Sequence, residues 1–259
     1  MSIESAVTLV TPLASRLAKP TLSLYNRARM DERRIAELLQ PFLTAPIPEQ
    51  ENGETRVLNE RQVQQFSAYL DLLLRWNARV NLTAVRDAEN IVTRHFGESL
   101  FAARCLFAPT TGEQRSAAEI CLIDFGSGAG FPGLPIKIWS PQLRVILLES
   151  NNKKATFLRE VIRALGLGDV EVISDRAENY RGAPGDVVTF RAVERFEASL
   201  MIATRLVRPG GRLAILVGEN QVLKSKELIS DFHWADPIRL PLSLNRVVLI
   251  GSQSTNQVG

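Results

Sequence analysis

The sequence predicts an α/β fold in which a mostly parallel, doubly wound sheet follows a small helical segment. Three observations indicate this fold. Apolar residues recur at helical spacing between residues 31 and 107, whereas short apolar runs alternate with helical stretches from Ile120 onward. Such alternation is typical of strand–helix–strand units. A glycine-rich turn directly follows the first apolar run, where a sheet of this class approaches its ligand.

The composition is that of a globular protein, with 45% hydrophobic and 23% charged residues among 259. The two cysteines (Cys105, Cys121) and two histidines (His95, His233) lie far apart, so we expect neither a disulfide framework nor a bound metal. No apolar run reaches the roughly 18 residues that a membrane span needs. These features predict a cytoplasmic protein.

The basic residues are dominated by arginine, which supplies 25 of 31, at a formal net charge of +3. Arginine forks match phosphate oxygens and guanine edges. A GC-rich genome produces the same bias, so charge alone does not predict a nucleic-acid binder.

Residues 1–30 are rich in Ser and Thr and carry four basic residues but one acid. We interpret them as a disordered or artefactual extension, with a targeting segment as the alternative. A helix is predicted from Asp31. The polar stretch at 44–56, with Pro46, Pro48 and Gly53, predicts a loop.

Two longer helices follow this loop. Asn59 with Gln62 three residues later predicts an N-cap, and that helix runs to about Asn77. The second covers roughly 88–107. We expect a helical N-terminal domain at 31–115, a second domain at 116–252 and a tail at 253–259.

Continuous apolar runs in the second domain predict strands covered on both faces. The expected strands lie at 120–125, 144–149, 170–174, 187–190, 213–217 and 247–250, and the helices between them at 132–139, 153–165, 196–207 and 221–230.

The glycine-rich turn runs from Asp124 to Gly133. Residues 124–130 fit the pattern D-x-G-x-G-x-G, which suits S-adenosylmethionine because the carboxylate of Asp124 can lie near an ammonium group. Glu149 ends the next strand, 21 residues after Gly128, where an acid can bind ribose hydroxyls. The dinucleotide pattern G-x-G-x-x-G also fits, from Gly128 to Gly133. An NAD(P)-binding oxidoreductase therefore remains an alternative.

Further segments extend this pattern beyond a generic nucleotide site. They are Arg75-Trp76-Asn77 with Asn81-Leu82-Thr83, Arg94-His95-Phe96 with Glu98-Ser99, Leu147-Leu148-Glu149-Ser150, Lys153 with Phe157-Leu158-Arg159, Arg176-Ala177-Glu178 and Arg191-Ala192. Together with the glycine-rich turn, they resemble the ribosomal RNA small subunit methyltransferase G family, also called glucose-inhibited division protein B. The resemblance covers roughly Leu58 to Gly251.

The resemblance implies a Rossmann-like, class I S-adenosylmethionine-dependent methyltransferase with a seven-stranded, mostly parallel sheet. It also implies methyl transfer to N7 of a guanine in 16S ribosomal RNA. Carried over by position, the cofactor contacts are Gly126, Phe131, Ala177, Glu178 and Arg191. To these the pattern of the turn and the ribose argument add Asp124, Gly128 and Glu149.

The chain departs from the family pattern in four places. Ala129 stands where proline is common, and Glu98 where aspartate is common. Val217-Gly218 stands where Lys-Gly is usual after the fifth strand, so the RNA contact of that lysine is not expected here. A longer stretch than usual separates Arg191-Ala192 from Leu200.

The implied chemistry needs no general base, because N7 carries a free lone pair. The sequence has neither an Asn/Asp-Pro-Pro-aromatic motif nor a Pro-Cys nucleophile. We therefore assign no catalytic residue with certainty, and expect Arg191 to position substrate or cofactor.

RNA binding would be largely electrostatic. We expect the main RNA contacts at Arg94, His95, Lys153, Arg195 and Arg246, and further phosphate contacts at Arg75, Arg79, Arg86, Lys154 and Arg191. The expected partner is 16S rRNA or the small ribosomal subunit, bound by a monomer. A methyltransferase for a small molecule or protein, and a non-enzymatic regulator, remain alternatives.

Overall fold

A computed structural model describes residues 29–48, 57–107, 120–191 and 195–254. The predicted extension up to residue 28, most of the loop at 44–56, the domain boundary near 115 and the last five residues of the tail lie outside these ranges.

The helical segment begins with α1 (Glu32–Thr44), which is capped by the Asp31 side chain. The N-cap predicted for α2 (Glu60–Val80) is confirmed: the Asn59 side chain accepts from Gln62 N at 2.9 Å, and the Gln62 side chain accepts from Asn59 N at 3.0 Å. The helix is one turn longer than expected and ends at Asn81 in the left-handed conformation.

The single helix predicted over 88–107 is three consecutive elements. They are α3 (Ala88–Ile91), a π-helical segment (Val92–Gly97) and α4 (Glu98–Phe107). Apolar periodicity does not reveal a wide turn inside an otherwise regular helix, so the prediction missed it. The segment ends at Gly97, where a Cβ atom would overlap the ring of Phe42 in α1.

This close approach makes Gly97 a test of the packing. Gly97→Ala is expected to lower the free energy of unfolding by about 1–3 kcal/mol, because the added methyl group overfills the contact with Phe42. Denaturant unfolding measures the effect. Gly168→Ala is the matched control, since nothing lies within 4 Å of its Cβ position. Equal stability of both variants would contradict the contact.

The sheet contains β1 (Cys121–Phe125), β2 (Arg144–Leu148), β3 (Val170–Ile173), β4 (Gly185–Arg191), β5 (Val207–Gly218), β6 (Phe232–Trp234), β7 (Ile238–Arg239) and β8 (Arg246–Gln253). The order is β3-β2-β1-β4-β5-β8-β6, and β7 also pairs with β8. The pairings among β1 to β5 are parallel and those of β8 antiparallel, which confirms the predicted Rossmann-like, mostly parallel sheet. Because of the short β7, the sheet has eight strands within the described residues, where seven were expected.

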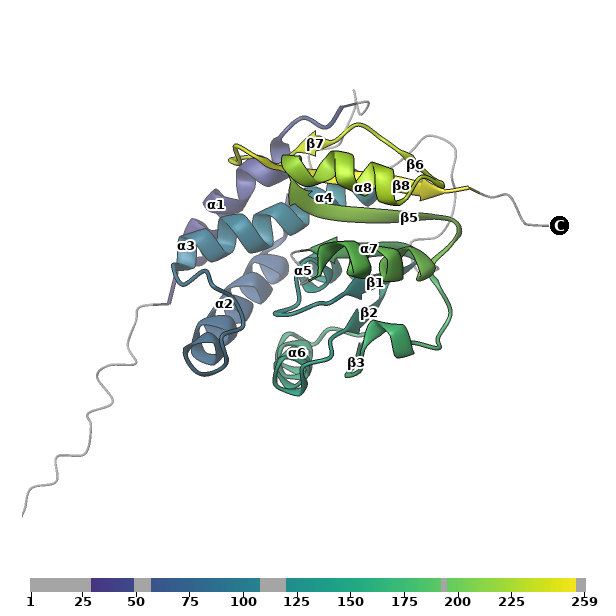
Figure 1. Cartoon of the computed structure of the whole chain (residues 1–259). Helices are drawn as coiled ribbons and strands as arrows, with labels where there is room; N and C mark the ends of the chain where they lie inside the picture. Colours follow the sequence, from purple (N-terminus) through teal and green to yellow (C-terminus); the bar gives the residue numbers. More distant parts are fainter. Residues whose placement is uncertain (1–28, 49–56, 108–119, 192–194, 255–259) are drawn as a thin grey trace, which may run out of the picture.

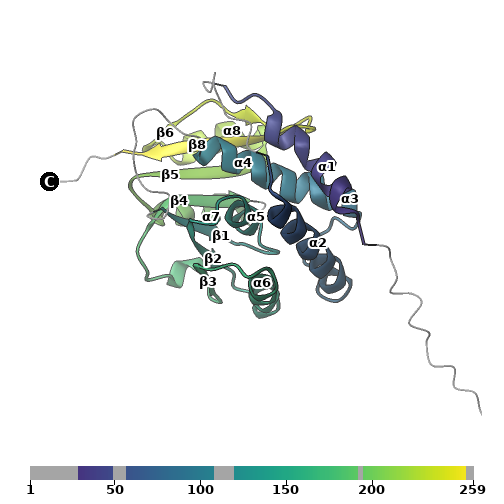
Figure 2. The ribbon, with the colours of Figure 1, turned by 180° about the vertical axis from the view of Figure 1, so that it is seen from behind.

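Helices cover both faces of the sheet. One face packs against α5 (Gly133–Trp139) and α6 (Asn152–Leu165), and the other against α7 (Phe196–Arg205) and α8 (Val222–Leu228) (Figures 1 and 2). Short 3-10 turns lie at Ala177–Asn179 and Glu219–Gln221. Among the described helices, none combines the length and hydrophobicity that crossing a bilayer requires.

The helical segment shares its core with the sheet. One buried cluster contains Phe66 and Leu100 from the helical segment together with Leu134 and Phe157 from α5 and α6. In addition, Gln62 of α2 donates to the carbonyl of Ile138 at 2.8 Å. These contacts pack α2 and α4 against α5 and α6.

Candidate active site

A cavity of about 1000 Å³ lies at the carboxyl ends of β1, β2, β4 and β5. Its other walls are the loop at 82–85, the π-helical segment and the start of β8. Nine predicted contact residues line it: Gly126, Gly128, Phe131, Glu149, Arg191, Arg94, His95, Lys154 and Arg246. The fold therefore brings the glycine-rich turn and an arginine-rich cluster into one space.

The glycine-rich turn needs glycine at two positions for different reasons. Gly128 has a φ of +59°, and a Cβ there would find no atom closer than 3.8 Å, so its backbone borders open space. Gly130 has a φ of +91°, and a Cβ there would overlap the Tyr69 hydroxyl and Leu134. Gly128 thus leaves room for a ligand, whereas Gly130 lets the turn pack on the protein.

Asp124 lies beneath this turn and is fully buried. Its carboxylate accepts from the Thr189 hydroxyl at 2.7 Å and from Gly133 N at 3.2 Å. Burial raises the pKa of Asp124 to about 6, although these hydrogen bonds oppose the shift. Its side chain is not among those lining the cavity, so its contacts tie β1 to β4 and to the start of α5.

Glu149, directly after β2, closes the other side of the turn. It accepts from Gly128 N at 2.8 Å and from Asn151 N at 2.7 Å. An ionised carboxylate has about four acceptor positions, so two remain for hydroxyl groups of a ligand. This position, at the edge of the cavity, is compatible with the predicted ribose contact.

Arg191, at the end of β4, lies in a polar cluster with the π-helical segment. Its Nη2 atom is 2.6 Å from the carbonyl oxygen of Arg94, 3.1 Å from His95 Nδ1 and 3.3 Å from Glu98 Oε2. Its Nη1 atom is buried and has no hydrogen-bond partner among the described residues. The Nη2 atom of the guanidinium is therefore fixed by hydrogen bonds, whereas the N–H groups of Nη1 have no acceptor among the described residues.

Glu98 is the central carboxylate of this cluster and was not predicted as a site residue. Its side chain is 2% exposed, and it pairs with both Arg191 and Arg246. Burial raises the pKa of Glu98, and the two arginines oppose that rise. The guanidinium group at each oxygen favours the ionised form of the carboxylate.

His95 is held from both sides of its ring. Because arginine only donates, Nδ1 accepts from Arg191, so the proton is on Nε2, which lies 2.8 Å from Thr83 Oγ1. The ring stacks on Phe131 with centroids 4.6 Å apart. Burial, together with the neighbouring arginines, lowers the pKa of His95 to about 3. The imidazole is therefore neutral at neutral pH.

Tyr69 of α2 packs against the glycine-rich turn and was not predicted as a site residue. Its hydroxyl donates to the carbonyl oxygen of Ala129, and its ring stacks on Phe131 at 5.6 Å. Asn77 of the same helix bonds the backbone of Thr83 and Val85, which shapes the loop at 82–85. The helical segment thus forms part of the cavity wall.

The remaining predicted residues do not line the cavity. Ala177 and Glu178 form the 3-10 turn after β3, where Ala177 is half-buried and Glu178 exposed. Lys153 is exposed at the start of α6, whereas its neighbour Lys154, also a predicted phosphate contact, lines the cavity. Arg195 borders an adjacent hollow with Phe196 and Lys224.

Of the other expected phosphate contacts, Arg75, Arg79 and Arg86 are exposed near the end of α2. Arg86 donates to the Asn77 carbonyl at 2.7 Å.

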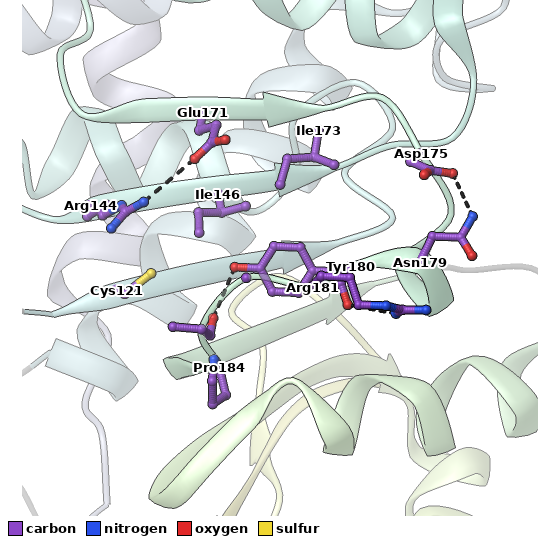
Figure 3. A pocket seen from close by; sticks show the side chains of 12 residues that line it. Cys121, Arg144, Ile146, Glu171, Ile173, Asp175, Asn179, Tyr180, Arg181 and Pro184 are labelled. Atoms are coloured by element: carbon purple, nitrogen blue, oxygen red, sulfur yellow. Dashed lines mark hydrogen bonds and ion pairs between the residues drawn. The ribbon is translucent and has the colours of Figure 1, made fainter.

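A second cavity, of about 470 Å³, lies on the face of the sheet that α7 covers (Figure 3). The Arg144–Glu171 ion pair and the Tyr180 ring border it, and the Tyr180 hydroxyl donates to the Ala183 carbonyl at 3.0 Å. None of the predicted site residues lines it. The candidate active site is therefore the larger cavity.

Comparison with known proteins gives consistent matches. A family model described as rRNA small subunit methyltransferase G matches residues 62–233. Ribosomal RNA small subunit methyltransferase G from Roseiflexus sp. (strain RS-1) is 48% identical over 161 residues, 60% of this chain and 65% of that protein. The chain thus spans less than two thirds of this relative's length.

A longer match is to Ribosomal RNA small subunit methyltransferase G from Roseiflexus castenholzii (strain DSM 13941 / HLO8). It is 40% identical over 206 residues, 74% of this chain and 84% of that protein. Among solved structures, ribosomal protein L11 methylase from Lactobacillus delbrueckii subsp. bulgaricus matches with a TM-score of 0.50 and 11% identity, covering 62% of this chain and 79% of that chain. This last likeness supports the fold alone.

Proposed function

The chain belongs to the rRNA small subunit methyltransferase G family, and from this membership we propose that it methylates N7 of a guanine in 16S ribosomal RNA with S-adenosylmethionine as the methyl donor. The substrate is 16S rRNA or the small ribosomal subunit, which implies action in the cytoplasm. We propose that the protein acts as a monomer.

One observation carries this proposal. The glycine-rich turn, Glu149 and the cluster of Glu98, Arg191 and Arg246 line the same cavity of about 1000 Å³. Gly128 leaves the backbone open to a ligand, and Glu149 keeps acceptor positions for ribose hydroxyls. The residues present therefore fit an adenosine-containing cofactor. Gly126 and Phe131 would complete its binding site within the cavity, and we propose Ala177 and Glu178, in the 3-10 turn outside the cavity lining, as further contacts.

When bound, S-adenosylmethionine would supply an electrophilic methyl group. The acceptor N7 has a free lone pair, so no proton has to be removed before the reaction. The described residues agree with this chemistry. The carboxylates that line the cavity are Glu98 and Glu149, and both already accept bonds from arginines or amides. The protein's contribution is then orientation of the reactants and exclusion of water.

Arg191 and His95 are the groups best placed to orient the substrates. The Nη1 donors of Arg191 remain for a ligand, while Nη2 is held by the π-helical segment. The neutral imidazole of His95 adds a flat surface at the cavity wall without adding charge. Arg94 and Arg246 line the same cavity and would meet RNA phosphates near its entrance, with Lys153 and Arg195 further away.

The ribose contact yields a quantitative expectation. Glu149→Ala should weaken S-adenosylmethionine binding by about 1–3 kcal/mol, because it removes one side of buried hydrogen bonds. Isothermal titration calorimetry measures the affinity. Glu171→Ala, which changes an exposed carboxylate beside the second cavity, is the matched control and should bind normally. An unchanged affinity of Glu149→Ala would mean that the ribose lies elsewhere.

The activity itself is tested with labelled S-adenosylmethionine. The acceptors are 16S rRNA and small subunits from cells that lack this protein, followed by mapping of the methylated nucleotide. We expect N7-methylguanine at a single position. Cofactor binding without label in RNA would instead favour a small-molecule or protein substrate, or a regulator.

A further inference from the structure

The loop that joins β7 to β8, residues 240–245, exposes two leucines beside the active cavity. The exposed fractions of Leu242 and Leu244 are 72% and 90%. Leu240 begins the loop and Arg246, the first residue of β8, follows it, and both of these residues line the cavity. The two exposed side chains therefore stand within two residues of the cavity wall.

This loop holds its leucines in a fixed conformation. Leu242 has a φ of +57°, which is unfavourable for a branched side chain. Around it, Ser243 N donates to Leu240 O at 3.2 Å, and Arg246 N donates to the Ser243 hydroxyl at 3.1 Å. Strained positions persist where the surroundings over-determine them, and they concentrate at ligand-contacting sites. The backbone conformation of the loop therefore leaves both leucine side chains exposed to solvent.

Three arginines lie around the loop and the cavity beside it. Arg239 donates to the carbonyl of Leu244 and pairs with Glu219, and Arg246, which follows the loop, pairs with Glu98. Arg94 is exposed on the cavity wall and has no carboxylate partner among the described residues. Exposed leucines at a cavity that also carries the exposed Arg94, unpaired within the described residues, fit a nucleic acid, which offers phosphates and flat base faces together.

We propose that Leu242 and Leu244 form an apolar wedge, which fills the gap left in the RNA when the target nucleotide leaves its stack. This inference rests on the proposed function. The cluster around Glu98 and Arg191 is recessed, with exposed side-chain fractions of 2% and 11%. The N7 edge of paired RNA faces a deep, narrow groove that side chains cannot enter. The guanine must therefore leave its stack, and apolar side chains are known to occupy such gaps.

The wedge is tested with the double variant Leu242→Asn/Leu244→Asn. Asparagine tolerates a positive φ and both positions are exposed, so the fold should be retained. Leu223→Asn on α8, at 68% exposure and outside the cavity, is the matched control. Methylation is measured on 16S rRNA, on small subunits and on a short single-stranded fragment that contains the mapped guanine. Affinity for S-adenosylmethionine is measured in parallel.

We expect the double variant to lose about tenfold in kcat/KM on 16S rRNA, with normal cofactor affinity and a much smaller loss on the short fragment. The control should match the wild type on every substrate. An equal loss on the short fragment, or no loss on 16S rRNA, would overturn the wedge. A loss confined to assembled subunits would indicate a protein contact instead. A wild type that methylates no RNA would overturn the proposed function and the wedge together.

Discussion

Arg191→Ala is expected to reduce methyl transfer severely while the protein stays folded. The guanidinium is anchored through Nη2 by Arg94 O, His95 and Glu98, which leaves Nη1 for substrate or cofactor. Truncating one partner of a buried, hydrogen-bonded charge pair costs about 2–5 kcal/mol. If that loss falls on the transition state, turnover drops roughly 30- to 5000-fold. Steady-state methylation of 16S rRNA measures it.

Two controls accompany this variant. Arg191→Lys keeps the positive charge but loses the planar fork, so it should recover only a small part of the activity. The fold should remain, because Glu98 keeps its second partner, Arg246. Far-ultraviolet circular dichroism and thermal unfolding check that it does. Wild-type turnover in a folded Arg191→Ala protein would refute the role assigned to this residue.

Glu98→Ala is expected to cause a large loss of stability. Its carboxylate is 2% exposed and contacts both Arg191 and Arg246. Without it, two guanidinium groups remain near one another in a low-dielectric site. Removing one partner of a buried ion pair costs about 3–5 kcal/mol. For a chain of this size, the melting temperature should fall by roughly 6–20 °C.

Other carboxylate variants isolate the cause. Glu98→Asp preserves the charge and should retain most of the stability. Glu98→Gln removes the charge at nearly constant volume and should resemble alanine. Glu89→Ala breaks the exposed ion pair between Glu89 and Arg34 and should leave stability close to that of the wild type. If Glu98→Gln were as stable as the wild type, the charge of Glu98 would be unimportant.

Much of the fold could be predicted because its signals are local. Asn59 and Gln62 predicted the start of α2. The apolar runs predicted β1 to β5 and β8, and most of the predicted strand ends lie within a few residues of the observed ones. The strands β6 and β7 have three and two residues, too few for a run to stand out. The π-helical segment was missed because its apolar residues keep a helical spacing.

The site residues also divide into those that local sequence signals predict and those that depend on distant partners. The glycine-rich turn, Glu149 and Arg191 follow strands, and the carboxyl ends of parallel strands meet at one edge, so topology brings them together. Glu98 instead depends on Arg191 and Arg246, which are distant in sequence, and a helical glutamate is usually solvated. One signal was present: Glu98 is the single carboxylate in the otherwise largely apolar segment from Phe96 to Leu106.

The π-helical segment also sets the rotational phase of α4. A wide turn of this kind is equivalent to one residue inserted into an α-helix. Each residue of a regular helix advances its side chain by about 100°, so deleting one residue between Val92 and Gly97 would turn Glu98 away from the arginines or displace Arg94 and His95. The number of residues in this short stretch is therefore a constraint on the positions of Glu98, Arg94 and His95, in addition to the identities of its amino acids.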